Sequence, residues 1–553
     1  MCTTMIITCG ATQDGSMLVT HSDDNELSDQ RFIFVPAQDH TPGSMRGIVA
    51  GINDGYPRLV SKDRGPGYDT QGWPVTPIIG LIPQVDHTYA YFDGSYGIMN
   101  EHNLMFGECT NGAKYMPPNP VTKEEAEKTG KHSRLFYSAE LSRVALERCR
   151  LAREAVNLMG LLIDEYGYFS TGETLLVADE KEAWVFEMCA LPDEEYHSAW
   201  IAQRVPDGTV FVAANEFRIR EIKPGSDDQI FSSRLIPGLT KLGWTPKEGP
   251  IDWLVAISQG EYNHPYYSLR RVWRVFDRVN PDLGLSPWVE NGYTMEYPFS
   301  IKPKNKLQTK DVFSLYRDHY EGTQFDMTKG IAAGPYGDPT RIYGNYDGSS
   351  YDISNHKLYG AWERPISVYY QGYTYVLQTQ PNAHDLTKGV CWFGPDISYT
   401  TCFVPFPAKV ERLPLSYQIG DPQKFSRAAA WWSFDFVANW ARLNFQRIYR
   451  VDIQPLQMSL EVSQANILDE WERKAHDGCS RHELTALCEA NASEVINAWW
   501  ELADMLVAKY SDGYINQKPS RPQNEGAVSI GYSSDWLKLT NYQTGPISYD
   551  MDI

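Results

Sequence analysis

The residues that decide the fold are CTTMIITCGATQDGSMLVTHSDD, positions 2–24. They contain a β-prone run from Thr3 to Thr8, an Asp-Gly turn signal at Asp14-Gly15 and a second β-prone run from Met17 to Ser22. Two such runs joined by a turn signal predict a β-hairpin. We therefore expect the chain to start as a strand pair, with its second residue at a strand tip.

Cys2, at this strand tip, can act in catalysis if the initiator methionine is removed. Methionine aminopeptidases remove Met1 when the next side chain is small, so we expect the mature chain to begin with a thiol and a free α-amine on one residue. An α-amine has a pKa of about 7.7–8.0 and a thiol a pKa of about 8.5, so proton transfer between them is nearly isoenergetic near neutral pH. One residue then supplies both nucleophile and base.

A Met-Cys start means little by itself, and the hairpin gives it context. A hairpin of this length brings the carboxylate of Asp24 back towards the α-amine of Cys2. A solvated turn residue is the alternative interpretation of Asp24. Acyl transfer would further need donors for an oxyanion and charged groups that hold the amine and the thiolate.

Further hairpins flank a pair of helices in the first half of the chain. Apolar residues recur at helical spacing between Ser133 and Tyr166 and predict two helices. A second hairpin is predicted from Thr174 to Met188, and a third from Trp200 to Ala213 through a turn at Pro206-Asp-Gly208. Hairpins around helices predict an α+β layered design, with antiparallel sheets covered by helices.

The second half of the chain is first strand-rich and then helical. Residues 300–415 carry strand signals, whereas Phe425–Tyr449 and Leu484–Tyr510 place Trp and Leu at helical spacing, which is more typical of packing than of a cofactor site. We predict a core at residues 2–415 and a helical C-terminal portion at residues 416–553 packed on it. No linker marks the boundary, so a single domain remains an alternative.

Composition excludes several classes of protein. The chain has 553 residues and a formal net charge of −20, so we expect no nucleic-acid partner. The first twenty residues contain no Lys or Arg, and no run approaches membrane-spanning length, so we expect no secretory signal, no membrane association and a cytoplasmic location. Nine cysteines without a CxxC pair or zinc spacing are typical of reduced thiols, and we expect no metal or other cofactor.

Motifs spread over residues 2–450 resemble those of one known family. They are CTT at 2–4 with DGS at 14–16, GIMNEH at 97–102, GECTN at 107–111, AREAV at 152–156, RVPDG at 204–208, ANEFRI at 214–219, YSLRRVW at 267–273, WFG at 392–394, and KFSR at 424–427 before AWW at 430–432. In these motifs the chain resembles the C69 cysteine dipeptidases, within the N-terminal-nucleophile superfamily that also holds bile salt hydrolases and penicillin V acylases. The resemblance implies an αββα sandwich, in which two antiparallel sheets lie between helical layers.

The resemblance also implies roles for individual residues. Cys2 is nucleophile and base, Asp24 anchors the α-amine, and Asn215 offers its side-chain amide to the oxyanion. Asn111 is expected at the other side of the same oxyanion hole.

Two positions stay open at this point. Arg271 is the better match for the cation near the thiolate, but spacing alone does not exclude Arg270, which could instead form a surface ion pair. The relatives carry Arg at the position of His21, which we assign to substrate binding. Since His titrates near neutrality, we expect a pH-sensitive contact or plain hydrogen bonding there, and a non-catalytic His is an equal alternative.

Three functions follow, in order of preference. The first is cytoplasmic hydrolysis of dipeptides through an S-acyl enzyme at Cys2, with small peptides as partners and a homo-oligomer allowed by the resemblance. The second is another amide hydrolase of the superfamily, acting on conjugated bile salts or penicillin V. The third, from a different class, is a non-catalytic binding protein, for example one that uses its many aromatic residues to bind glycans.

Overall fold

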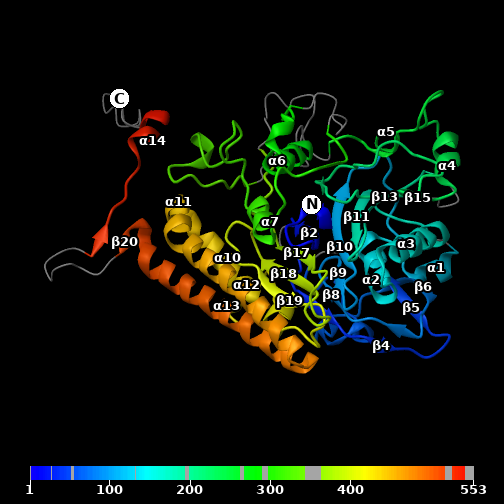
Figure 1. Cartoon of the computed structure of the whole chain (residues 1–553), viewed down its shortest axis with the longest axis horizontal. Helices are drawn as coiled ribbons and strands as arrows, with labels where there is room; N and C mark the ends of the chain where they lie inside the picture. Colours follow the sequence, from blue (N-terminus) through cyan, green and yellow to red (C-terminus); the bar gives the residue numbers. More distant parts are fainter. Residues whose placement is uncertain are drawn as a thin grey trace.

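The computed structural model describes residues 2–25, 28–50, 55–130, 133–192, 198–261, 267–288, 297–342, 363–516 and 526–541. Two antiparallel sheets pack face to face, and helices cover both outer faces (Figure 1). The predicted αββα sandwich with a helical C-terminal part is therefore confirmed.

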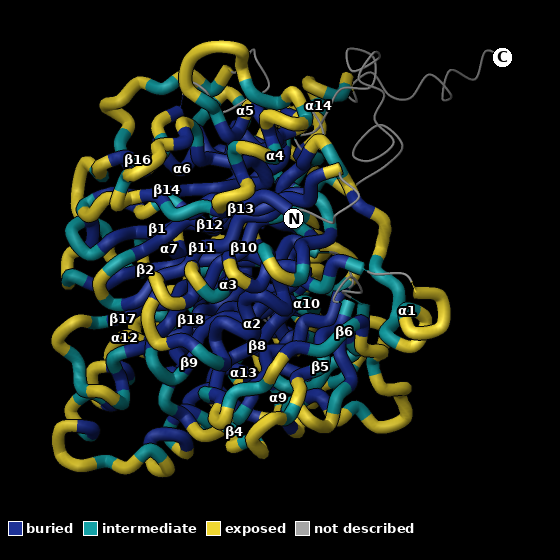
Figure 2. The backbone as a smooth tube through the Cα atoms, turned by 90° about the vertical axis from the view of Figure 1, so that its right-hand side faces the viewer, coloured by how far each residue is buried: buried dark blue, intermediate teal, exposed yellow. Residues whose placement is uncertain are grey.

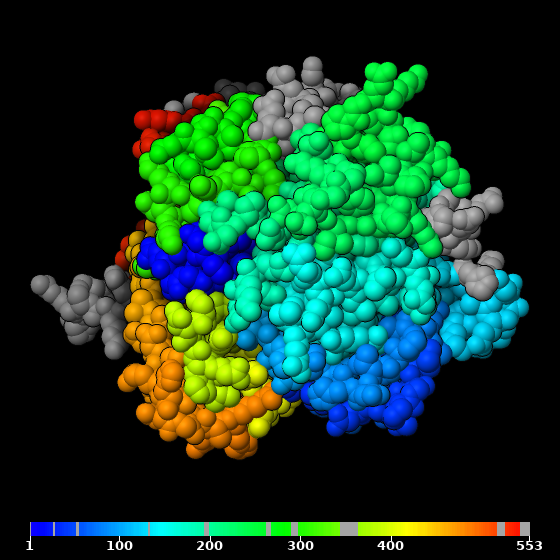
Figure 3. Space-filling view, turned by 45° about the vertical axis from the view of Figure 1, so that its right-hand side comes forward, coloured from blue at the N-terminus to red at the C-terminus, as the bar shows by residue number. Residues whose placement is uncertain are grey.

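The predicted first hairpin forms and lies in the centre of one sheet. Strand β1 (Cys2–Ile7) pairs with β2 (Met17–Asp23), and the register places Cys2 opposite Asp23. All residues of both strands are buried, so neither face of the hairpin meets solvent. Its turn reaches the surface, where dark-blue N-terminal residues lie between green and yellow-green segments (Figure 3); there Gln378 Nε2 donates a 3.0 Å hydrogen bond to Asp14 Oδ2.

The first sheet has seven strands in the order β16-β14-β1-β2-β17-β18-β19. Its other members are β14 (Val210–Ala213), β16 (Ser300–Ile301), β17 (Tyr373–Thr379), β18 (Gly389–Pro395) and β19 (Val404–Pro407).

The second sheet has eight strands in the order β15-β13-β12-β11-β10-β9-β8-β3. They are β3 (Ile33–Val35), β8 (Tyr91–Asp93), β9 (Gly97–Asn100), β10 (Met105–Asn111), β11 (Gly172–Ala178), β12 (Ala183–Ala190), β13 (Ser198–Arg204) and β15 (Gln229–Phe231).

The prediction of a third hairpin between Trp200 and Ala213 is wrong. Both strands form, as β13 and β14, but they belong to different sheets. The turn before Thr209 therefore carries the chain from one layer to the other. The local sequence pattern indicates two strands and a turn, but it does not determine which neighbouring strand each of them pairs with.

Helices form the two outer layers. Against the second sheet lie α2 (Ser138–Arg148) and α3 (Ala152–Tyr166), the predicted helical pair. Against the first sheet lie α6 (Leu269–Val279), α7 (Thr309–Tyr316), α10 (Ala430–Ala441), α12 (Gln454–His476) and α13 (Arg481–Tyr510). The last three pack on β18 and β19, so the C-terminal helices complete the sandwich (Figure 1).

Shorter elements lie around this sandwich. They are α1 (Lys123–Thr129), α4 (Leu235–Lys241), α5 (Trp253–Ile257), α9 (Leu415–Gln418), α11 (Phe445–Ile448), α14 (Ser534–Leu539), and the strand pairs β4 (Gln38–Asp39) with β7 (His87–Thr88), β5 (Met45–Val49) with β6 (Ile78–Pro83), and β20 (Ile515–Asn516) with β21 (Ala527–Val528). None of the described helices is long and apolar enough to cross a membrane.

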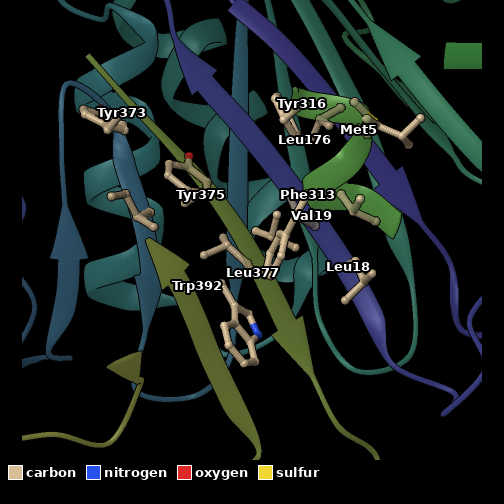
Figure 4. Close-up of a cluster of buried hydrophobic side chains, with 14 of the residues drawn as sticks. Met5, Leu18, Val19, Leu176, Phe313, Tyr316, Tyr373, Tyr375, Leu377 and Trp392 are labelled. Atoms are coloured by element: carbon tan, nitrogen blue, oxygen red, sulfur yellow. The ribbon is translucent and has the colours of Figure 1, made fainter. Parts of the chain in front are cut away.

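The core fills the space between the sheets and beneath the helices, and the buried strands form the dark-blue centre of Figure 2. Val19, Leu176 and Leu377 pack there with aromatic residues of β17, β18 and α7 (Figure 4). At one point the sheets approach very closely, because a Cβ on Gly107 would lie 2.5 Å from Thr4 Oγ1 and 2.7 Å from Thr20 O. Gly107 thus lets β10 lie directly against β1 and β2.

Candidate active site

Strand β10 presents a row of backbone carbonyls to the first sheet. Strand β9 pairs with β10 at Met99–Met105, and further along β10 its paired neighbour is β11, on the other side. Alternate carbonyls on the side away from β11 accept hydrogen bonds from the first sheet and the turn after β14: Phe106 O from Tyr375 Oη at 3.0 Å, Glu108 O from His21 Nδ1 at 2.9 Å, and Thr110 O from Asn215 Nδ2 at 2.6 Å. This edge therefore fixes His21 and Asn215 beside the end of β1.

Cys2, at the start of β1, is bonded through both its thiol and its carbonyl. The thiol donates to Glu108 Oε2 at 3.0 Å, and the carbonyl oxygen accepts from Arg271 Nη1 at 2.8 Å. Burial, followed by the negative charge of Glu108, raises the pKa of the thiol well above its usual value. The resting Cys2 is accordingly a thiol and not a thiolate.

Arg271 joins Cys2 to Asn215, the residues expected to serve as nucleophile and oxyanion donor. Its guanidinium donates to Cys2 O and, through Nη2, to Asn215 Oδ1 at 2.7 Å. Arg270 points elsewhere: its Nη1 lies 3.3 Å from Glu363 Oε1, and its guanidinium lies 3.5 Å from the ring centre of Phe325. Successive residues of a helix point about 100° apart, so α6 can present one arginine of the pair to Cys2 and direct the other away.

Asn215 sits in the turn that follows β14, with a φ of 63°. This left-handed conformation is tolerated by Asn better than by most residues. The side-chain amide carries two hydrogens, and the bond to Thr110 O uses one of them. Since Arg271 holds the amide oxygen, the orientation of the whole side chain is fixed.

Asp24 and Asn111 have partners other than Cys2. Asp24 Oδ2 accepts a hydrogen bond from Arg364, and both side chains are buried. Asn111 Nδ2 donates to Thr174 Oγ1 on the neighbouring strand at 2.7 Å. The structure thus brings Cys2, Asn215 and Arg271 into one hydrogen-bonded group, while the recorded bonds of Asp24 and Asn111 lead to Arg364 and Thr174.

His21 is fully buried between the rings of Tyr96, Tyr373 and Tyr375. Burial lowers its pKa, so the ring is neutral near pH 7. A neutral ring that donates from Nδ1 to Glu108 O has its lone pair on Nε2.

A pair of buried carboxyl groups, Glu108 and Glu173, lies beside the thiol. Burial and the charge of Glu108 raise the pKa of Glu173 well above its usual value. Burial is the largest single influence on Glu108 and opposes its ionisation, but the hydrogen bonds with Glu173 and Cys2 and the neighbouring positive groups together outweigh burial and lower the pKa of Glu108. Ser138 Oγ donates to Glu173 Oε2 at 2.9 Å. Glu173 is therefore the protonated member of the pair, and Glu108 is the carboxylate that faces Cys2.

One group of three residues in the described part of the chain has the composition and closeness of a metal site. Cys2, His21 and Asp23 each offer a ligand atom, and these atoms lie within 4.8 Å of one another. Burial raises the pKa of Asp23 to about 6, and Ser95 Oγ donates to its Oδ2 at 2.7 Å.

These groups together suit acyl transfer. Arg271 links the carbonyl of Cys2 to the side-chain amide of Asn215. A nearby pocket is lined in part by Tyr267, whose carbonyl accepts a hydrogen bond from Arg271, and by Arg364, the partner of Asp24. The sequence profile of peptidase family C69 matches residues 101–457, more than half of the chain. The chain belongs to peptidase family C69.

Curated relatives of this C69 peptidase match across most of its length. A probable dipeptidase of Salmonella dublin is 24% identical over 76% of this chain and 83% of its own, and a probable dipeptidase of Latilactobacillus sakei is 22% identical over 82% and 83%. A dipeptidase of Bifidobacterium longum is 22% identical over 75% and 72%. The family profile begins downstream of Cys2, His21 and Asp24, so it covers Asn111, Asn215 and Arg271 but not the first hairpin.

Three residues near Cys2 or Asp24 in this C69 peptidase were not predicted from the sequence. Glu108 lies inside the GECTN motif, so the motif could have identified it as a candidate site residue. Glu173 meets Glu108 diagonally across β10 and β11, which no local pattern reports. Arg364 donates a hydrogen bond to Asp24, which lies 340 positions away in the sequence, and Arg364 is not part of any motif named above.

Proposed function

We propose that this C69 peptidase hydrolyses dipeptides through an S-acyl enzyme formed at Cys2. The observation that carries the proposal is the double contact of Arg271, which bonds both the carbonyl of Cys2 and the side-chain oxygen of Asn215. Nucleophile and oxyanion donor are thereby held in one rigid unit, as acyl transfer requires. The dipeptide substrate is supported by the names of the relatives.

In the first step the thiol attacks the peptide carbonyl. Removal of Met1 frees the α-amine of Cys2, which takes the proton from Sγ as the Sγ–C bond forms. The carbonyl electron pair moves to oxygen, and the oxyanion is held by Asn215 Nδ2 and, on the other side, by Asn111. Each of these amides keeps one hydrogen beyond its bond to Thr110 O or Thr174 Oγ1.

In the second step the C–N bond breaks and the ammonium group of Cys2 returns its proton to the leaving amine. Water then attacks the thioester, and the α-amine takes a proton from it as the new C–O bond forms. The C–S bond breaks, the ammonium group returns that proton to Sγ, and the second product leaves as the acid. Asp24 is the proposed anchor of the α-amine: it directly follows Asp23, which lies opposite Cys2 in the strand register, and its side chain is held by an ion pair with Arg364. The raised pKa of the Cys2 thiol makes an adjacent base necessary.

The environment of the cysteines agrees with a cytoplasmic enzyme. All nine are free thiols, and most are buried. Disulfides are rare in the cytosol because thiols are kept reduced there. We therefore propose that the enzyme works in the cytoplasm, which cell fractionation with an antibody to the chain tests.

The decisive experiment combines intact mass spectrometry with a substrate panel. The active enzyme should lack Met1, and Cys2→Ala should abolish turnover of dipeptides, whereas the matched variant Cys391→Ala, which removes another buried thiol, should retain it. The panel should include conjugated bile salts and penicillin V. Active protein that retains Met1 refutes the mechanism, and preferential turnover of bile salts or penicillin V refutes the substrate.

A further inference from the structure

Three groups with the chemistry of metal ligands meet at the end of the first hairpin. Cys2 and Asp23 are opposite each other in the β1–β2 register, and His21, two residues from Asp23, shares its face of the strand. Their ligand atoms lie within 4.8 Å of one another, and no other set of three or more His, Cys, Asp and Glu residues meets this criterion in the described ranges. Tetrahedral zinc with bonds of about 2.0–2.3 Å separates its ligands by roughly 3.5 Å, so the three groups need to close by at most about 1.3 Å.

The side chains of His21 and Asp23 are held by hydrogen bonds of the kind that orient metal ligands. His21 donates from Nδ1 to the backbone carbonyl of Glu108 at 2.9 Å, which leaves Nε2 as the nitrogen with the lone pair. Nε2 is buried and has no hydrogen-bond partner in the structure. Metal-bound histidines characteristically donate their other nitrogen to a carbonyl or carboxylate. Asp23 is likewise oriented by Ser95 Oγ at 2.7 Å.

The electrostatic surroundings also favour a cation. Glu108, Asp23 and Asp24 all act on the Cys2 thiol as negative charges. A divalent ion at this point would be attracted by these carboxylates, and the chain as a whole carries a formal charge of −20. Sulfur, nitrogen and oxygen ligands together are the set that zinc accepts.

We infer that Cys2, His21 and Asp23 form an inhibitory site for Zn²⁺, which occupies the nucleophile and switches the peptidase off. The thiol loses its proton to solvent, its hydrogen bond to Glu108 breaks, and a sulfur lone pair forms the bond to zinc. No redox change is involved. The inference rests on the proposed function in two respects: Cys2 is the nucleophile that zinc blocks, and once Met1 is removed the α-amine of Cys2 becomes the fourth ligand and closes a five-membered chelate with Sγ.

Binding is measured without reference to activity. Cd²⁺ replaces Zn²⁺ as a probe because a thiolate–cadmium bond gives an ultraviolet charge-transfer band. Titration of the wild-type enzyme should give this band at one ion per chain, with Zn²⁺ displacing Cd²⁺. Cys2→Ala should abolish the band, whereas His21→Gln and Asp23→Asn should each weaken affinity for Zn²⁺ by at least about 10-fold.

Matched variants separate ligation from general damage. Ser95→Ala keeps all three ligands and removes the donor to Asp23, so it should weaken Zn²⁺ binding by about 10-fold in a protein that folds normally. Cys391→Ala and the exposed His87→Gln should bind as the wild type does. The inhibition constant for Zn²⁺ in the peptidase assay should follow the same order.

The outcomes are distinct. Equal Zn²⁺ affinity in the wild type, His21→Gln, Asp23→Asn and Ser95→Ala overturns the inference, since the ion would then be held by the thiol alone. Absence of the cadmium band in the wild type also overturns it. Failure of the enzyme to hydrolyse dipeptides counts against the proposed function instead, because the band and its dependence on His21 and Asp23 do not require turnover.

Discussion

The two ends of the first hairpin are equally buried and chemically opposite. At one end, Ile6, Leu18 and Val19 are at most 1% exposed and make apolar contacts with the core. At the other end, Cys2 and Asp23 are at most 2% exposed but carry groups that ionise. Burial of an apolar group stabilises a fold, whereas burial of a polar group costs free energy unless it is hydrogen-bonded. The apolar end therefore holds the sandwich together, and the sandwich holds the polar end in place.

Specific partners stabilise the polar end. Arg271 bonds the carbonyl of Cys2, Ser95 bonds Asp23, and Arg364 bonds Asp24. Each partner comes from a different element of the chain. Substitutions at the polar end should consequently affect turnover most, and those at the apolar end should affect stability alone.

The largest effect is expected at Arg271. Arg271→Met removes the donor to Cys2 O and frees the side chain of Asn215, so kcat/KM for a dipeptide should fall by about 10³-fold. The control is Arg270→Met, which removes an equally buried arginine from the same helix. Its contacts are with Glu363 and Phe325, so kcat should stay within a few-fold of wild type even if the protein is less stable. Steady-state kinetics that show equal losses in the two variants would contradict the assignment.

Asn215 should follow with an effect on kcat of about 10²–10³-fold. Asn215→Ala removes the proposed oxyanion donor, and losses of this size are typical of that change. Asn111→Ala is the informative partner, because Asn111 already donates to Thr174 and its second hydrogen is the one proposed for the oxyanion. Single-turnover measurements of acyl-enzyme formation compare the two; wild-type rates in Asn215→Ala would remove it from the mechanism.

The apolar end could be predicted from the sequence better than the polar end. Two β-prone runs and an Asp-Gly turn suffice to predict the hairpin, because both signals are local. The neighbours of β13 and β14 could not be predicted in this way, since two strands joined by a short turn can enter different sheets. Hairpins around a helical pair predicted antiparallel sheets covered by helices, and the family resemblance added the αββα order of the layers; the two sheets confirm both.

The polar end depends on distances that the sequence does not contain. Whether Arg270 or Arg271 meets Cys2 depends on the rotation of α6 about its axis, which packing decides. The ion pair between Asp24 and Arg364 joins residues 340 positions apart. The carboxyl pair of Glu108 and Glu173 requires the register of β10 against β11. The motifs thus indicated which residues are candidates for the active site, and the tertiary structure determines which of them are in contact.

A core substitution at the apolar end should change stability and leave turnover intact. Leu18→Ala should reduce the free energy of unfolding by about 3 kcal/mol, because it removes buried methyl groups and leaves a cavity. Chemical denaturation measures this loss, and kcat of the folded variant should remain within about twofold of wild type. A drop in kcat comparable to that of Asn215→Ala would mean that the two ends are not separable.

The smallest effect is expected at a buried carboxyl far from the thiol, Glu187 on β12. It accepts hydrogen bonds from Arg218 N at 2.6 Å and Trp253 Nε1 at 2.7 Å. Burial nevertheless raises its pKa from 4.5 to about 7. The folded state therefore retains a proton that the unfolded state has released, and stability should fall as the pH rises from about 4.5 to about 7. The loss amounts to at most about 3 kcal/mol and stays constant at higher pH.

Glu187→Gln tests this cost of burying a carboxylate outside the proposed catalytic group. The amide does not titrate, so the difference in free energy of unfolding between pH 5 and pH 8 should shrink by about 2 kcal/mol relative to wild type, whatever the variant does to stability at a single pH. The exposed Glu165→Gln should leave that difference unchanged. Equal pH dependence in wild type and Glu187→Gln would show that the hydrogen bonds from Arg218 and Trp253 fully offset the cost of burying the carboxylate. Burial of a carboxyl group would then be weaker evidence for a functional role than the carboxyl groups around Cys2 suggest.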